Sequence, residues 1–189
     1  TPIEETMNCL MNLKKEGKVR AIGISNVSLE ELDSYRRAGE LDSNQFRYSM
    51  LSRGAEQEQT PFCKKYDISG IAYWCLERGL LAGGIGPDRV FSEDDFRNDA
   101  ADWLPWFRIE NRRRLQGMFL GWKDLTEKYE CSIGNISTAW TLGQPGVTHV
   151  LLGNRSAQQA ISNAYAGSIR LEQEDIKRID ADLVGLGPA

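Results

Sequence analysis

The first residues of the chain alternate apolar and polar positions with a helical period. Apolar side chains recur every three or four residues over positions 3–13, and Gly17 follows as a helix-ending residue. Thr1 and Glu4 have the spacing of a capping box, with proline between them at a position that suits the first helical turn. The pattern therefore predicts a helix that starts at the beginning of the chain.

Short apolar runs then alternate with further helical patterns. The runs predict strands at 18–25, 43–48, 68–74 and 148–152. The helical patterns predict helices at 28–39, 56–66, 111–129, 133–142, 156–164 and 173–183, the first of them opened by a capping box of Ser28 and Glu31. Strands that alternate with helices are typical of βα units and a parallel sheet.

The segment 77–107 has no periodicity and is rich in glycine, proline and aspartate. A connection of this length is far longer than most, which favours a lid or a binding loop. The aromatic side chains in and after it are expected to pack as a core beneath the loop; they are Trp103, Trp106, Phe107, Phe119 and Trp122. The arginine run 112–114 is expected to lie on a solvated helix face.

Composition places the chain among ordinary globular domains. It has 189 residues, 41% hydrophobic and 26% charged, and a net charge of −4. This acidic balance argues against a nucleic-acid partner. No apolar run is long enough for a membrane helix and no signal-peptide pattern is present, so no membrane partner and a cytoplasmic location are expected. The four scattered cysteines predict reduced thiols and no metal site.

Ligand chemistry in parallel α/β folds lies at the carboxyl ends of the strands. The residues at those ends are Ser25 and Asn26, then Gln45, then Tyr73 and Trp74, and finally Gly153 and Arg155. A nicotinamide cofactor needs hydroxyl and amide groups for its carboxamide, an aromatic face for its ring, and a cation or helix N-terminus for its phosphates. Each residue alone has an ordinary structural explanation, and the prediction depends on their occurrence together.

Four stretches of the chain resemble the C-terminal half of the aldo-keto reductases, on the branch that includes bacterial stress-type reductases and potassium-channel beta subunits. They are TPIEETMNCLMNLKKEGKVRAIGISN, QFRYSMLSR, AYWCLERGLLAGG and WTLGQPGVTHVLLGNRSAQQAISN. The resemblance implies the second half of a (β/α)8 TIM barrel, one partial domain over 1–189 that is incomplete without an N-terminal half. It also implies reduction of aldehydes or ketones by NADPH.

The resemblance assigns cofactor-binding roles to twelve residues. Ser25, Asn26 and Gln45 would hold the nicotinamide carboxamide, Tyr73 would stack on the ring, and Trp74, Leu76, Arg78 and Gly79 would follow the pyrophosphate. Arg155 would lie at the 2′-phosphate, Gln159 and Asn163 would lie at the adenine end, and Gly153 is the remaining cofactor-binding residue. The chain departs from the family pattern at Ala82, Gly84 and Ser162, where a hydroxyl residue, a lysine and a glutamate are usual.

The family's catalytic Asp, Tyr, Lys and His precede the segment that matches Thr1 onward, so no catalytic residue is expected within this chain. His149 lies inside a predicted strand and is expected to make a structural hydrogen bond, and Cys75 is expected to be a small buried residue. The chain alone is then expected to be inactive, as the cofactor-binding half of a carbonyl reductase. The alternatives are a non-catalytic partner-binding half-barrel, completed by a second copy or by a separate N-terminal half, and a nucleotide sensor.

Overall fold

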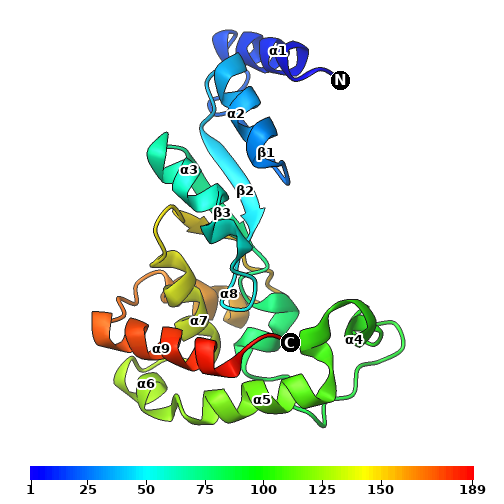
Figure 1. Cartoon of the computed structure of the whole chain (residues 1–189), viewed down its shortest axis with the longest axis vertical. Coiled ribbons are helices and arrows are strands. Elements are labelled where there is room, and N and C mark those ends of the chain that lie inside the picture. Colours follow the sequence, from blue (N-terminus) through cyan, green and yellow to red (C-terminus); the bar gives the residue numbers. More distant parts are fainter. The chain divides into compact units, whose positions relative to one another are not determined.

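The computed structural model describes all residues 1–189, which divide into two compact units. The first unit comprises residues 1–74 and 141–151, and the second comprises residues 75–140 and 152–189. Their elements are labelled in Figure 1. No helix in either unit is both long and apolar enough to cross a membrane.

The first unit contains a four-stranded parallel sheet in the order β1-β2-β3-β4. The strands are β1 (Gly23–Ser25), β2 (Ser43–Arg47), β3 (Ser69–Tyr73) and β4 (His149–Val150). The helices are α1 (Ile3–Lys15), α2 (Leu29–Ala38) and α3 (Gln59–Lys65), with a short 3-10 turn η1 (Gly54–Glu56). The predicted parallel sheet of four strands is confirmed, although β1 and β4 are shorter than the apolar runs.

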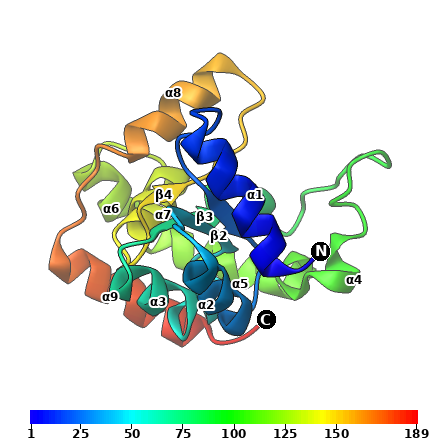
Figure 2. The ribbon, with the colours of Figure 1, turned by 90° about the horizontal axis from the view of Figure 1, so that it is seen from above.

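One face of this sheet is covered by helices. Asn44 and Phe46 on β2 and Ala72 on β3 are buried, whereas their sequence neighbours on the other face are partly exposed. Asn44 Nδ2 donates to Gln59 Oε1 at the start of α3 at 2.7 Å, so the buried face is the one on which α3 lies. Figure 1 shows α3 beside β2 and β3, and Figure 2 shows α1 and α2 beside each other.

The second unit is mainly helical. Its α-helices are α4 (Ala100–Trp103), α5 (Ile109–Leu120), α6 (Lys123–Lys128), α8 (Ala157–Ala166), α9 (Gln173–Leu186) and most of α7 (Ile133–Leu142). Short 3-10 segments occur at η2 (Glu77–Ala82) and η3 (Pro105–Phe107).

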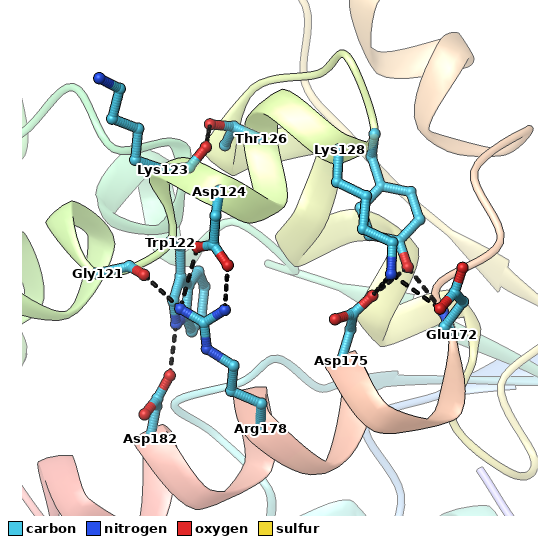
Figure 3. Close-up of polar contacts among 11 residues, drawn as sticks. Gly121, Trp122, Lys123, Asp124, Thr126, Lys128, Glu172, Asp175, Arg178 and Asp182 are labelled. Carbon is cyan, nitrogen blue, oxygen red and sulfur yellow. Dashed lines mark hydrogen bonds and ion pairs between the residues drawn. The ribbon is translucent and has the colours of Figure 1, made fainter.

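Polar contacts hold α9 against α6 and the turn before it, as Figure 3 shows. The indole of Trp122 is fully buried, and its Nε1 donates to Asp182 at 2.7 Å. Arg178 pairs with Asp124, and Lys128 lies 2.8 Å from a carboxylate oxygen of Asp175. These contacts fix the C-terminal helix of the second unit to a buried aromatic side chain.

The structure corrects several expectations about helix ends. Ser28 and Glu31 do form the predicted capping box. Thr1 does not cap α1, because Pro2 occupies the N-cap position and no side chain caps that helix. The helix predicted over 111–129 is two helices that separate at Gly121 and Trp122.

Two expectations about side chains near the long segment were also wrong. Arg112 is buried, because its guanidinium donates to the carbonyl oxygens of Gly86 and Arg89 at 3.0 and 2.9 Å, so it does not lie on a solvated face. Phe107, Phe119 and Trp122 are buried as expected, but the side chain of Trp103 is 49% exposed.

A close backbone approach fixes β3 against the turn that precedes β4. A Cβ atom on Gly70 would lie 1.9 Å from the carbonyl oxygen of Gly146, and Gly146 itself has φ +85° and abuts the backbone of Thr60. Only glycine allows backbones to approach so closely.

We predict that Gly70→Ala lowers the free energy of unfolding by about 1–3 kcal/mol, because the added methyl group must displace the backbone. Gly117→Ala is the control: Gly117 is exposed in α5 with open space around its Cβ position, so alanine there should stabilise by about 0.5–1 kcal/mol. Urea denaturation of both variants measures the difference. Equal stability of Gly70→Ala and wild type would contradict the prediction.

Candidate functional site

The exposed face of the sheet carries a row of side chains from all four strands. In-register pairing aligns Ser25 with Gln45, Gln45 with Ile71, and Ile71 with His149. Side chains two residues apart on a strand share a face, so Tyr73 lies on this face one step nearer the carboxyl ends. The sheet therefore brings the predicted residues of β1, β2 and β3 to one face, near the carboxyl ends of the strands.

Hydrogen bonds connect these residues before any ligand is considered. The hydroxyl of Ser25 donates to the main-chain oxygen of Gln45 at 3.1 Å and lies 3.4 Å from its Oε1. The phenol of Tyr73 donates to Oδ1 of Asn26 at 2.6 Å. Asn26 has φ +58°, a left-handed conformation that asparagine tolerates better than most residues. The amide and hydroxyl groups at this edge are thus held in place by their neighbours.

Trp74 also has a left-handed backbone, with φ +59°. Its indole packs edge-on against the ring of Tyr73, with centroids 5.8 Å apart, and the guanidinium of Arg47 lies 4.9 Å from the indole centroid. Left-handed backbone is unusual for a bulky aromatic residue, and such residues cluster at functional sites. Sequence reasoning missed Arg47, although its place two residues after Gln45 puts it on the same face and its pairing with Tyr73 puts it beside that ring.

Three other predicted residues begin the second unit. Leu76 precedes η2, and its carbonyl oxygen accepts from the backbone N–H of Gly79 at 2.8 Å. Arg78 and Gly79 have φ values of +56° and +102°. The guanidinium of Arg78 lies 4.7 Å from the ring centroids of both Phe96 and Trp103. The long segment therefore supplies two aromatic rings that contact Arg78. These contacts could not be predicted from the sequence, because the segment has no periodic pattern.

Arg97 links two parts of the same segment. Its Nε donates to a carboxylate oxygen of Asp95 at 2.8 Å, its Nη1 lies 3.5 Å from the carbonyl oxygen of Arg78, and its guanidinium lies 4.9 Å from the ring of Phe91. The hydrogen bonds from Arg97 hold the pKa of Asp95 far below its ordinary value, and the positive charge of Arg155 adds to this effect. The ion pair gives order to a segment that has little regular structure.

The remaining predicted residues lie around the start of α8. Ser156 caps this helix by accepting from the N–H of Gln159 at 3.2 Å, and Gln159 Oε1 in turn accepts from the N–H of Arg155 at 2.7 Å. Asn163 Nδ2 donates to Oδ1 of Asn154 at 2.7 Å. Gln159 and Asn163 thus brace the turn that contains Gly153 and Arg155, and the Arg155 side chain is exposed beside a helix N-terminus, where anions bind favourably.

Among the positions that depart from the family pattern, Ser162 makes a structural contact, and a contact also lies between Ala82 and Gly84. The carbonyl oxygen of Gly83, between Ala82 and Gly84, accepts from Gln116 at 2.9 Å. The carbonyl oxygen of Ser162 accepts from Asn135 at 2.7 Å. Neither contact introduces a cation in place of the usual lysine.

Candidate catalytic groups in this chain have other partners. Tyr48 is buried and donates to Glu56, and Tyr66 packs under the guanidinium of Arg36 at 4.2 Å. His149 lies on β4, as predicted, with its Nδ1 2.9 Å from the hydroxyl of Thr148. Cys75 is fully buried, as predicted. No three or more His, Cys, Asp or Glu side chains gather as metal ligands anywhere in residues 1–189.

These observations define an α/β protein whose parallel sheet presents polar and aromatic groups at its carboxyl edge. A family model described as the aldo/keto reductase family matches residues 1–183, and the chain belongs to that family.

Solved structures similar to this chain include the glycerol dehydrogenase AKR11B4 from Gluconobacter oxydans. It has a TM-score of 0.89 and 30% identity, covering 100% of this chain and 56% of that one. The thermostable aldo-keto reductase Tm1743 shares the fold, with a TM-score of 0.69 and 21% identity over 96% of this chain and 55% of its own. The parallel sheet thus has TIM-barrel proteins of this family as its structural neighbours.

Curated relatives extend the comparison. The chain is 37% identical over 175 residues to the NADH-specific methylglyoxal reductase of Escherichia coli (strain K12), covering 93% of this chain and 52% of that protein. It is 33% identical over 183 residues to the aldo-keto reductase YhdN of Bacillus subtilis (strain 168), covering 96% and 54%. The chain therefore spans about half the length of these relatives.

We predict that the ion pair of Asp95 and Arg97 makes stability depend on pH. The folded-state pKa of Asp95 is lowered, so its contribution is present above the unfolded value of about 4 and is lost as pH falls toward the folded value. The wild type should therefore exceed Asp95→Asn in urea midpoint at pH 7, with a gap that narrows below about pH 4. Asp94→Asn, at an exposed neighbouring position, is the control and should show no such gap. A gap for Asp95→Asn that stays constant with pH would contradict the prediction.

Proposed function

We propose that residues 1–189 form the nicotinamide-binding half of an oxidoreductase that transfers hydride to an aldehyde or ketone substrate. The observation that supports this most directly is the group at the carboxyl edge of the sheet. Ser25, Asn26 and Gln45 combine one hydroxyl with two amides beside the ring of Tyr73. A nicotinamide ring is flat and carries a carboxamide with both donors and an acceptor, which such a set recognises.

The second unit supports the proposal through its own residues. The left-handed turn at Arg78 and Gly79 and the braced turn at Gly153 and Arg155 each carry an arginine side chain. Such groups suit the phosphates of a dinucleotide. The cofactor would bring the hydride chemistry when bound, and these side chains would bind and orient it.

We propose further that no residue of this chain acts as the catalytic acid. Tyr48 is buried and donates to Glu56. Tyr66 lies at the end of α3, where Arg36 and Lys65 contact its ring, and not at the carboxyl ends of the strands. Residues 1–189 alone would then bind the cofactor without turnover.

The proposed cofactor is NADP, for which Arg155 is the residue that supports the choice. An arginine at a helix N-terminus is a good partner for a 2′-phosphate, since charge-assisted bonds are roughly twice as strong as neutral ones. Two features favour NAD instead: the family lysine is absent at Gly84, and one relative is named as NADH-specific. The cofactor choice therefore depends on a measurement of Arg155.

We predict that Arg155→Gln weakens NADPH binding about tenfold or more and changes NADH binding less than about twofold. Titration of each cofactor against tryptophan fluorescence, in the full-length protein that contains these residues, measures both constants. Arg113→Gln removes one exposed charge from α5 and is the matched control. Tighter NADH than NADPH binding by the wild type would overturn the NADP assignment alone, and failure to bind either would overturn the proposed function.

We also propose that the sheet is half of an eight-stranded barrel. β1 pairs only with β2 and β4 only with β3, so each has one open edge, and open edges are usually paired or covered. A further four-stranded half would cover the strand edges. A second copy of this chain is the competing partner.

Hydrogen–deuterium exchange distinguishes these partners. We predict that peptides covering 23–25 and 149–150 exchange much more slowly in the full-length protein than in the 189-residue chain, because pairing protects edge strands. Peptides from the central strands β2 and β3 are the internal control. Protection in the 189-residue chain that rises with its concentration would favour the second copy, and equal exchange in both proteins would contradict the half-barrel.

A further inference from the structure

Tyr73 and Asn26 form a hydrogen bond that crosses the end of the sheet. Tyr73 is the last residue of β3, and Asn26 follows β1, while β2 lies between those strands. The Oη–Oδ1 distance is 2.6 Å, at the short end of the range for hydroxyl donors. The side chain of Tyr73 therefore both places a ring at the strand end and forms a hydrogen bond to the residue that follows β1.

This bond selects one orientation of the Asn26 amide. An exposed asparagine has a broad, nearly two-fold torsion about its last bond, so it can present either its oxygen or its NH₂ group to a ligand. In the structure Oδ1 accepts from Tyr73, and the backbone N–H of Asn26 donates to the main-chain oxygen of Gln45 at 3.2 Å. The Nδ2 group is then the end of the amide that remains available as a donor.

The neighbouring hydroxyl has the opposite polarity. Ser25 directs its proton to Gln45, so its oxygen lone pairs are available to accept. The edge therefore offers an N–H donor from Asn26 and an oxygen acceptor from Ser25, which match the carbonyl oxygen and the NH₂ group of a carboxamide.

We infer that the hydroxyl of Tyr73 is a positioning group for carboxamide recognition, acting through the side-chain amide of Asn26. This inference rests on the proposed function, because the ligand is the nicotinamide end of the cofactor. The ring of Tyr73 and its hydroxyl then have separate roles: the ring supports the nicotinamide face, and the hydroxyl sets which end of Asn26 meets the carboxamide.

A double-mutant cycle in the full-length protein tests the inference, with NADH and NADPH as probes. Tyr73→Phe keeps the ring and should raise the dissociation constant about three- to tenfold. Asn26→Gly removes the amide at a left-handed position that glycine adopts without strain. In the Asn26→Gly background, Tyr73→Phe should change the constant less than about twofold, since the group it acts through is gone.

Tyr35→Phe is the matched control, because the Tyr35 hydroxyl makes no hydrogen bond within residues 1–189, and it should leave binding unchanged. Urea midpoints of all variants separate a binding effect from a loss of folding. Additive effects of Tyr73→Phe and Asn26→Gly would overturn the inference, because the hydroxyl would then act independently of the amide.

A measurement on the free protein keeps the inference separate from the proposed function. In ¹⁵N relaxation, the Asn26 side-chain amide should be ordered in the wild type and mobile in Tyr73→Phe. Unchanged order in Tyr73→Phe would overturn the positioning role even if the cofactor binds. If neither cofactor binds the wild type, the proposed function fails and carboxamide recognition fails with it, whatever the relaxation data show for the hydroxyl.

Discussion

Parallel pairing holds Ser25, Gln45, Ile71 and His149 in one row across the sheet. The set of side chains that the first unit presents near the carboxyl ends of its strands depends on that register. Side chains alternate between faces along a strand, so a shift of one residue would turn Gln45 toward the helices. Register is secured on the covered face, where Asn44 bonds to the start of α3 and buried apolar residues leave no room for a shift. Packing on one face of the sheet thus determines the chemistry that the other face presents.

Much of this arrangement follows from local sequence, because its causes are local. The capping box of Ser28 and Glu31 involves four consecutive residues, and the apolar runs place all four strands. The errors occur where distant contacts decide. Arg112 has the sequence context of a surface residue, but carbonyl oxygens more than twenty residues earlier in the chain bind its guanidinium. The helix breaks at Gly121, next to the buried side chain of Trp122. The spacing of apolar residues in the sequence does not indicate this break.

The residue types at the candidate site could be predicted from sequence, but their mutual contacts could not. Ser25, Gln45 and Tyr73 lie near the ends of predicted strands. Because parallel strands run in the same direction, the sequence predicts that these residues meet at the carboxyl end of the sheet. The bond from Tyr73 to Asn26 depends on a left-handed backbone at Asn26 and on the span across β2. Likewise, Arg78 is recognisable as a cation, but its aromatic neighbours come from a segment without a repeating pattern.

In the proposed function, the two units have different roles in recognising the cofactor. NAD and NADP share the same nicotinamide end, so neutral groups such as Asn26 and Gln45 cannot distinguish them. Discrimination must come from charge near the 2′ position, and in the proposed site that charge is Arg155. Asp95 would oppose a phosphate there if it were unpaired, since its carboxylate interacts with the charge of Arg155. Because Arg97 already neutralises Asp95, the three side chains together keep one net positive charge. In the proposed function, the ion pair in the long segment would affect cofactor choice through the electrostatic field at Arg155, without itself touching a ligand.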